Sequence, residues 1–315
     1  MILALCAPGV GDLATAVPAL RAVRAACAAR NLTLAVPAWL NPLVDLVGGI
    51  DRVLPAAALA PKRWTGEAPE LAINLHGCGP ESHRLLAGVR PAKLWAFANP
   101  EAAHLDGPNW SDDEHDTHRW CRLLHHYGVP VDVDDLALAV PDTPAPRGVT
   151  IIHPGARASG RRWPPDRFAA VARALAVAGH HVVVTGSATE TGLAVRVARG
   201  AGLPASTVLA GRTGLAALAA LVAHARLVIS GDTGIAHLAT AYRIPSVVLF
   251  GPVPPGRWGP PPGRAYHRAI WRGGREAHGD TSGPAVHPAL LAVRPDEVLA
   301  AAAEAERARH PLAAP

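Results

Sequence analysis

Short runs of apolar residues alternate with longer amphipathic stretches along the first half of the chain. Residues 2–6, 32–36 and 71–75 are almost wholly apolar, and another short run covers residues 93–97. Between the first two, residues 13–30 place Leu13, Val17, Leu20, Val23 and Cys27 on one helical face. A strand, a helix and a second strand in this order predict a parallel sheet with a right-handed crossover. Residues 112–127 are predicted to form a further helix.

The same alternation restarts after a segment rich in proline and polar residues, 141–148. We therefore predict two domains, residues 1–145 and 146–315. The second pattern predicts strands at 149–152, 181–185, 208–210, 225–229 and 245–250, with helices at 165–178, 215–223 and 295–307. Residues 252–289 are rich in proline and glycine and are predicted to be mostly irregular. The fold class is thus α/β, with two Rossmann-like domains whose ligands bind outside the carboxyl ends of the strands.

Composition narrows the class of protein. The chain has 315 residues, 50% hydrophobic and 17% charged, and no apolar run is long enough to predict a membrane span. The first residues lack a basic segment and are predicted to be a strand rather than a signal peptide. Four widely spaced cysteines fit a reducing cytoplasm and argue against structural zinc. We expect a cytoplasmic monomer.

The formal net charge is +5, and only Lys62 and Lys93 are lysines. This charge would suit an anionic substrate or peripheral contact with the inner face of a membrane. No basic run with interleaved aromatic residues indicates nucleic acid.

The sequence Ser-Gly-Asp-Thr-Gly-Ile-Ala-His, residues 230–237, follows an apolar strand and opens a helix. Amide groups and the helix dipole at such a turn can bind phosphate, here at Thr233 and Gly234. Asp232 and His237 add a carboxylate and an imidazole. The alternative is an ordinary strand-to-helix turn in which Asp232 caps the helix.

Two further segments carry groups suited to a nucleotide. The loop 153–164 holds Arg157, Arg161 and Arg162, whose planar guanidinium groups suit diphosphate oxygens, although a solvated basic loop would look the same. Glu190 follows Gly186-Ser187 at a predicted helix start. It could bind ribose hydroxyls or merely cap that helix.

Near the N-terminus, Gly9-x-Gly11-x-x-Ala14 superficially matches a dinucleotide fingerprint. The second strand lacks the acid that would hold the ribose, which argues against a dehydrogenase. Asp12 could be a plain helix cap or a base that takes a proton from a hydroxyl. His115, His118 and Cys121 share a helical face, but an amphipathic helix explains them better than a metal site.

Taken together, these motifs resemble the family 9 glycosyltransferases, best known as ADP-heptose:lipopolysaccharide heptosyltransferases. The resemblance is carried by residues 11–20, 153–164, 186–190 and 230–237, continuing through 248–252 and Arg257-Trp258-Gly259-Pro260. It implies a GT-B fold and inverting transfer of a heptose-like sugar from a nucleotide diphosphate donor, expected to be ADP-linked, without a metal or other cofactor.

The resemblance also implies roles for individual residues. Asp12 matches the catalytic base, Glu190 the ribose-binding carboxylate and Asp232 the donor-sugar contact, with His237 in the same motif. Thr233 and Gly234 amides, with Arg157 and Arg161, would neutralise the leaving diphosphate. Arg161 stands where the family usually has lysine.

The acceptor stays open. Residues 272–278 fall where many relatives carry a cysteine cluster, and this chain has none there. Lipopolysaccharide, another cell-envelope glycan, a lipid-linked acceptor or a small molecule would each fit. The remaining alternatives are a glycosyltransferase of secondary metabolism using another nucleotide sugar, a GT-B sugar-nucleotide 2-epimerase, and a non-catalytic nucleotide-sugar binding protein.

Overall fold

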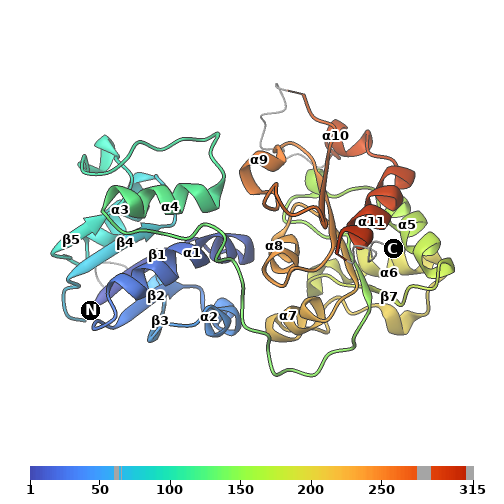
Figure 1. Ribbon diagram of the computed structural model, residues 1–315, viewed down its shortest axis with the longest axis horizontal. Helices are drawn as coiled ribbons and strands as arrows, with labels where there is room; N and C mark the ends of the chain where they lie inside the picture. Colours follow the sequence, from blue (N-terminus) through green and yellow to red (C-terminus); the bar gives the residue numbers. More distant parts are fainter. Residues whose placement is uncertain (60–63, 65, 275–284, 310–315) are drawn as a thin grey trace, which may run out of the picture. The chain divides into compact units, whose positions relative to one another are not determined.

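The chain divides into two compact units, Met1–Ala139 and Val140–Pro315, called here the N-terminal and C-terminal units (Figure 1). The computed structural model describes residues 1–59, 64, 66–274 and 285–309. Each unit contains one five-stranded sheet in which every pairing is parallel. The predicted α/β class with two parallel sheets is therefore confirmed.

The sheet of the N-terminal unit has the strand order β3-β2-β1-β4-β5. Its strands are β1 (Ile2–Cys6), β2 (Leu32–Val36), β3 (Arg52–Pro55), β4 (Leu71–Leu75) and β5 (Lys93–Trp95). All residues of β1, β2 and β4 are buried, which explains why these three strands read as continuous apolar runs. Edge strand β3 starts with exposed Arg52 and was not predicted, because a run of four residues is too short to show a strand pattern.

Helices and short 3₁₀ turns cover both faces of this sheet. They are α1 (Val10–Ala26), η1 (Ala38–Leu40), α2 (Asn41–Val47), η2 (Ala56–Leu59), α3 (Pro80–Ala87), η3 (Pro100–Ala102) and α4 (Asp116–His126). Helix α1 begins three residues before the predicted start and ends four residues before the predicted end.

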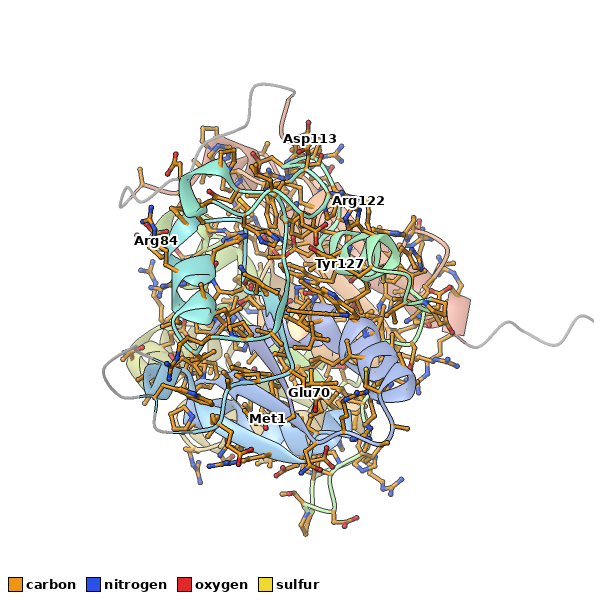
Figure 2. All side chains as sticks on the ribbon, turned by 90° about the vertical axis from the view of Figure 1, so that its left-hand side faces the viewer. Met1, Glu70, Arg84, Asp113, Arg122 and Tyr127 are labelled. Atoms are coloured by element: carbon orange, nitrogen blue, oxygen red, sulfur yellow. The ribbon has the colours of Figure 1, made fainter. Side chains whose placement is uncertain are left out.

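The N-terminus is held beside the start of β4. The Met1 amino group donates to Glu70 Oε1 over 3.1 Å, and the two residues lie beside each other in Figure 2.

The sheet of the C-terminal unit has the order β10-β9-β8-β6-β7. Its strands are β6 (Thr150–His153), β7 (Val182–Val184), β8 (Leu227–Gly231), β9 (Ser246–Phe250) and β10 (His267–Trp271). Residues 208–210 were predicted as a strand, and this was wrong. Val208 forms a single bridge to Val184, so the segment only touches the end of β7.

The elements that cover this second sheet are η4 (Ser159–Arg161), α5 (Pro165–Val177), η5 (Ala188–Glu190), α6 (Thr191–Ala201), η6 (Ala205–Thr207), α7 (Leu215–Ala223), α8 (Gly234–Ala241), α9 (Pro255–Trp258), α10 (Pro288–Leu291) and α11 (Pro295–Arg309). The described part of 252–289 is mostly irregular, as predicted, but it also contains edge strand β10, the short helix α9 and the start of α10. Residues 275–284 of this range lie outside the described residues. Among the described helices, none is long and apolar enough to cross a bilayer.

The core of the C-terminal unit determines which side chains reach the carboxyl edge of its sheet. Ile152, Ile229 and Leu249 join one buried cluster with α5, α6 and α11, while Ala236, Val248 and Phe250 form another. Because side chains alternate along a strand, residues at the strand ends are fixed in direction by these packed neighbours. The turns after β6, β8 and β9 therefore begin at strand ends that are held rigidly by the core.

Candidate functional site

Four turns of the C-terminal unit lie at the same edge of its sheet. Since all strands are parallel, the residues that follow β6, β7, β8 and β9 emerge at the carboxyl edge. The order β9-β8-β6-β7 makes these turns successive neighbours. This edge brings together Arg161, Glu190 and Asp232, which the sequence singled out in three separate motifs.

Arg161 and Asp232 form an ion pair between two of these turns. A guanidinium N–H of Arg161 donates to Asp232 Oδ2, and the two side chains are 24% and 9% exposed. Burial raises the pKa of the Asp232 carboxyl, while the adjacent Arg161 opposes that shift. Asp232 does not cap helix α8, whose N-cap residue is Thr233. The capping alternative for Asp232 is therefore wrong.

The guanidinium of Arg161 also lies over the ring of Trp258, with Cζ 5.2 Å from the ring centroid. Trp258 ends α9, in the turn that follows β9. From the sequence, Trp258 was named only as part of a motif, and no role was predicted for it. Local sequence patterns could not predict this contact, because the contact joins turns that follow two different strands.

Glu190 is held by the first residues of the turn after β7. The amide N and the hydroxyl of Ser187 donate to Glu190 Oε2 over 2.9 and 2.8 Å. Its other oxygen, Oε1, lies 3.5 Å from a guanidinium nitrogen of Arg162. Arg162 in turn donates to the carbonyl of Ala156 over 2.9 Å. Glu190 thus does cap a turn, and that cap fixes its carboxylate at the carboxyl edge of the sheet.

A buried histidine at the end of β6 was not selected from the sequence. His153 Nδ1 hydrogen-bonds Thr185 Oγ1 over 2.9 Å. Burial lowers the pKa of His153 to about 4, and the Glu190 carboxylate partly opposes this. The imidazole is neutral at physiological pH. Its neighbour in register, Ser230, has a buried hydroxyl with no hydrogen-bond partner among the described residues.

The start of α8 presents main-chain N–H groups at the same edge. Thr233 has an extended backbone and its side chain makes no capping hydrogen bond, and Gly234 is the first helical residue. The N–H groups of a first helical turn lack acceptors within the helix and favour an anion. His237 lies one turn further along and is half-buried. Arg157 is exposed, with no ion pair among the described residues.

Asp12 belongs to the N-terminal unit and lies in the first turn of α1, after β1. The N-cap residue is Gly9, which places Asp12 at the third helical position rather than at the N-cap itself. A Cβ on Gly9 would overlap Asp12 Oδ2, so a side chain at residue 9 would displace the Asp12 carboxylate. A carboxylate in a first helical turn is stabilised by the helix dipole.

A second carboxylate lies near Asp12. Burial raises the pKa of the Cys6 thiol at the end of β1, and the charges of Asp12 and Asp116 raise it further. Asp116 is paired with the buried Arg119, whose guanidinium lies 4.0 Å from the centroid of the Trp110 ring. The carboxyl end of β1 is therefore an acidic environment whose second carboxylate is neutralised by an arginine.

Of the three residues on α4 that were considered for metal binding, His115 has a structural role. His115 is the N-cap residue of α4, with Nδ1 accepting from Thr117 N over 3.2 Å. No group of three or more His, Cys, Asp or Glu in the described part of the chain is arranged to hold a metal ion. All four cysteines are free. Residues 275–278 of the segment compared with the relatives' cysteine cluster lie outside the described residues.

Comparisons with known proteins agree with the resemblance seen in the motifs. Residues 123–277 match the model of glycosyltransferase family 9 (heptosyltransferase). Over 103 residues, the chain is 38% identical to lipopolysaccharide heptosyltransferase 3 of Escherichia coli. This alignment covers 32% of the chain and 30% of that protein, so the matched part spans about a third of the relative's length.

Solved structures extend the similarity over both units. The E. coli ADP-heptose lipopolysaccharide heptosyltransferase II has a TM-score of 0.77 at 21% identity, covering 97% of this chain and 98% of that one. E. coli heptosyltransferase WaaC with ADP-2-deoxy-2-fluoro heptose has a TM-score of 0.66 at 18% identity, covering 90% and 96%. At these identities the likeness concerns the fold, which is GT-B as predicted.

Proposed function

We propose that this chain, a member of glycosyltransferase family 9 by the match over residues 123–277, transfers a heptose-like sugar with inversion from an ADP-linked donor to an acceptor hydroxyl. The observation that carries the proposal is the carboxyl edge of the C-terminal sheet. There Arg161, Asp232 and Glu190 come from three motifs and lie on adjacent turns. The matched relatives are named as heptosyltransferases, and one similar structure contains an ADP-linked heptose analogue.

In this mechanism Asp12 is the general base. The acceptor oxygen forms its bond to the anomeric carbon as its proton passes to the Asp12 carboxylate. The bond from the anomeric carbon to the diphosphate oxygen breaks on the opposite face, and the nucleoside diphosphate leaves with the electron pair. One catalytic carboxylate suffices, because a single displacement inverts the configuration of the anomeric carbon.

The C-terminal unit would bind the donor. Arg157, Arg161 and the amides at Thr233 and Gly234 provide donors for the departing diphosphate. Glu190 accepts from the ribose hydroxyls through the oxygen that Ser187 does not occupy. Asp232 contacts the donor sugar, and His237 lies beside it on α8. These groups can neutralise the leaving charge without a metal ion.

The acceptor we propose is a hydroxyl in a cell-envelope glycan of the lipopolysaccharide type, whether lipid-linked or free. The protein would act as a monomer in the cytoplasm, with peripheral contact at the inner face of the membrane. Its formal net charge of +5 supports contact with an anionic surface.

The first test is a thermal-shift panel with ADP, GDP, UDP and dTDP. A ligand that binds the folded state alone raises the melting temperature by mass action. We expect a selective shift with ADP, followed by turnover of ADP-heptose when an acceptor is supplied. A preference for UDP or dTDP would keep the fold and mechanism but replace the donor. No shift with any of the four would overturn the proposal, and conversion of the donor without acceptor would indicate an epimerase.

A further inference from the structure

Among the described residues, Trp258 is the one aromatic side chain whose ring faces the guanidinium of Arg161. The separation between Arg161 Cζ and the ring centroid is 5.2 Å, within the range of about 6 Å over which a cation is attracted to an aromatic face. Trp258 is half-buried rather than exposed. The contact therefore lies in a partly desolvated position, where this attraction is stronger than in water.

A rigid turn holds Trp258 in this place. Helix α9 has only four residues and begins with Pro255. The N–H of Gly259 donates to the Pro255 carbonyl over 2.6 Å, and a Cβ on Gly259 would overlap that carbonyl. The turn can close this tightly because Gly259 has no side chain. Trp258, directly before it, is thus fixed relative to β9.

Arg161 is consequently held from two directions. Asp232 binds one N–H at the edge of the guanidinium, and Trp258 lies against its face. These partners come from the turns after β8 and β9, while Arg161 itself follows β6. A planar guanidinium can be fixed by an edge contact and a face contact together, whereas a lysine ammonium has no face to stack. This arrangement gives arginine at residue 161 a physical role that lysine could not fill in the same way.

We propose that Trp258 is the positioning residue for Arg161, and that this chain recognises the donor diphosphate through the stacked pair rather than through a bare cation. The inference rests on the proposed function, because it assigns the pair to the same donor site. With one N–H engaged by Asp232 and the plane fixed by Trp258, the remaining N–H groups of Arg161 keep one orientation. A diphosphate then meets donors that need no reordering.

The proposal predicts that Trp258 and Arg161 depend on each other. Removing the ring should loosen the guanidinium. Replacing Arg161 by lysine should leave the ring little to orient, because an ammonium has no plane. The effects of the two substitutions on diphosphate affinity would then be strongly non-additive. A purely structural role for Trp258 would instead give independent effects.

The test is a double-mutant cycle on the affinity for ADP, or for whichever of the four nucleoside diphosphates shifts the wild-type melting temperature most. Isothermal titration would compare wild type, Trp258→Leu, Arg161→Lys and the double variant. We expect each single variant to bind about 3- to 30-fold more weakly, and the double variant to bind no more weakly than the worse single one. Trp258→Phe, which keeps an aromatic face, should recover most of the loss.

Trp39→Leu is the matched control, because Trp39 is 53% exposed and belongs to the N-terminal unit. It should leave nucleotide affinity unchanged. If Trp258→Leu does not fold, the unbranched variant Trp258→Met takes its place in the cycle. A loss below twofold, additive effects, or no recovery with Trp258→Phe would overturn the positioning role while the proposed function stands. Wild-type protein that binds none of the four nucleotides would overturn both.

Discussion

Gly155 lies directly against the carboxylate of Glu190. A Cβ on Gly155 would overlap Oε1, Oε2 and Cδ of that side chain. Ser187 already holds Glu190 Oε2 through two hydrogen bonds, so the carboxylate cannot withdraw without breaking them. The absence of a side chain at residue 155 is therefore what allows the carboxylate to lie at the carboxyl edge of the sheet.

Gly155→Ala should displace Glu190 and weaken nucleotide binding. We expect a destabilisation of about 1–3 kcal/mol from overpacking and an ADP affinity at least several-fold lower. If Glu190 binds the ribose, the variant should also lose the preference for ADP over its 2′-deoxy analogue. Isothermal titration with both nucleotides checks this. Gly192→Ala is the control, because that helical position has open space and should tolerate alanine. Wild-type affinity in Gly155→Ala would contradict the role of Glu190.

Asp12→Asn should abolish sugar transfer while nucleotide binding survives. The amide keeps the size of the carboxylate but cannot accept the acceptor proton, so we expect kcat to fall about 10²- to 10⁴-fold. The ADP-induced thermal shift should be unchanged, because the proposed donor groups all lie in the C-terminal unit. Asp45→Asn, an exposed change on α2 of the same unit, should be silent in both measurements. If Asp12→Asn retains turnover, Asp12 is not the general base.

The strands that the sequence predicts best are those buried on both faces. Residues 2–6, 32–36 and 71–75 match β1, β2 and β4 at both ends, because their apolar runs are bounded by polar or turn residues. The edge strand β10 escaped prediction. It carries His267 and Arg268 within a segment rich in proline and glycine, and an edge strand needs less apolar surface.

The candidate site could be predicted one motif at a time, but not as a set of contacts. Strand-turn-helix chemistry identified Glu190 and Asp232 as candidates, and the structure places both at one edge. The pairing of Arg161 with Asp232 and Trp258 depends on which strands are neighbours, and no local pattern encodes that order. Likewise, nothing in the local sequence indicated that His153 would be buried against Thr185.

Arg161→Met should destabilise the C-terminal unit by leaving the buried Asp232 carboxylate without its guanidinium. We expect a loss of about 1–3 kcal/mol at pH 7, less than for a fully buried pair because Arg161 is partly exposed. Urea unfolding measures it. Arg196→Met removes an exposed partner of Asp166 and should cost less than about 0.5 kcal/mol.

The stability deficit of Arg161→Met relative to wild type should be smaller in acid. Burial raises the pKa of Asp232 above its unfolded value, so the folded state binds the proton more readily than the unfolded state. The stability linked to this group is present at low pH and is lost as the pH rises through the folded pKa. The deficit of Arg161→Met relative to wild type should therefore shrink as the pH falls toward 4. A deficit independent of pH would mean that the lost contact is packing rather than charge.

The two most shifted histidines should make the protein lose stability between pH 6.5 and pH 4.5. Burial lowers the pKa of His153 and of His267 to about 4 in each case. Between that value and the ordinary value of about 6.5, the unfolded chain binds a proton that the folded chain refuses. The stability linked to each group is thus complete above pH 6.5 and declines as the pH falls, by at most about 3 kcal/mol per histidine.

Urea unfolding across this pH range separates the two histidines from the rest of the chain. His153→Gln and His267→Gln should each flatten the dependence of the unfolding free energy on pH, because glutamine keeps a polar partner for Thr185 or Ser246 but takes up no proton. His118→Gln, an exposed change on α4, should leave the slope as it is in wild type. The window lies above the range where most carboxylates titrate, so acidic side chains contribute little to the slope. If the slope is unchanged in His153→Gln, the wild-type His153 ring is hydrated and titrates normally. That result would contradict a buried neutral imidazole at the end of β6.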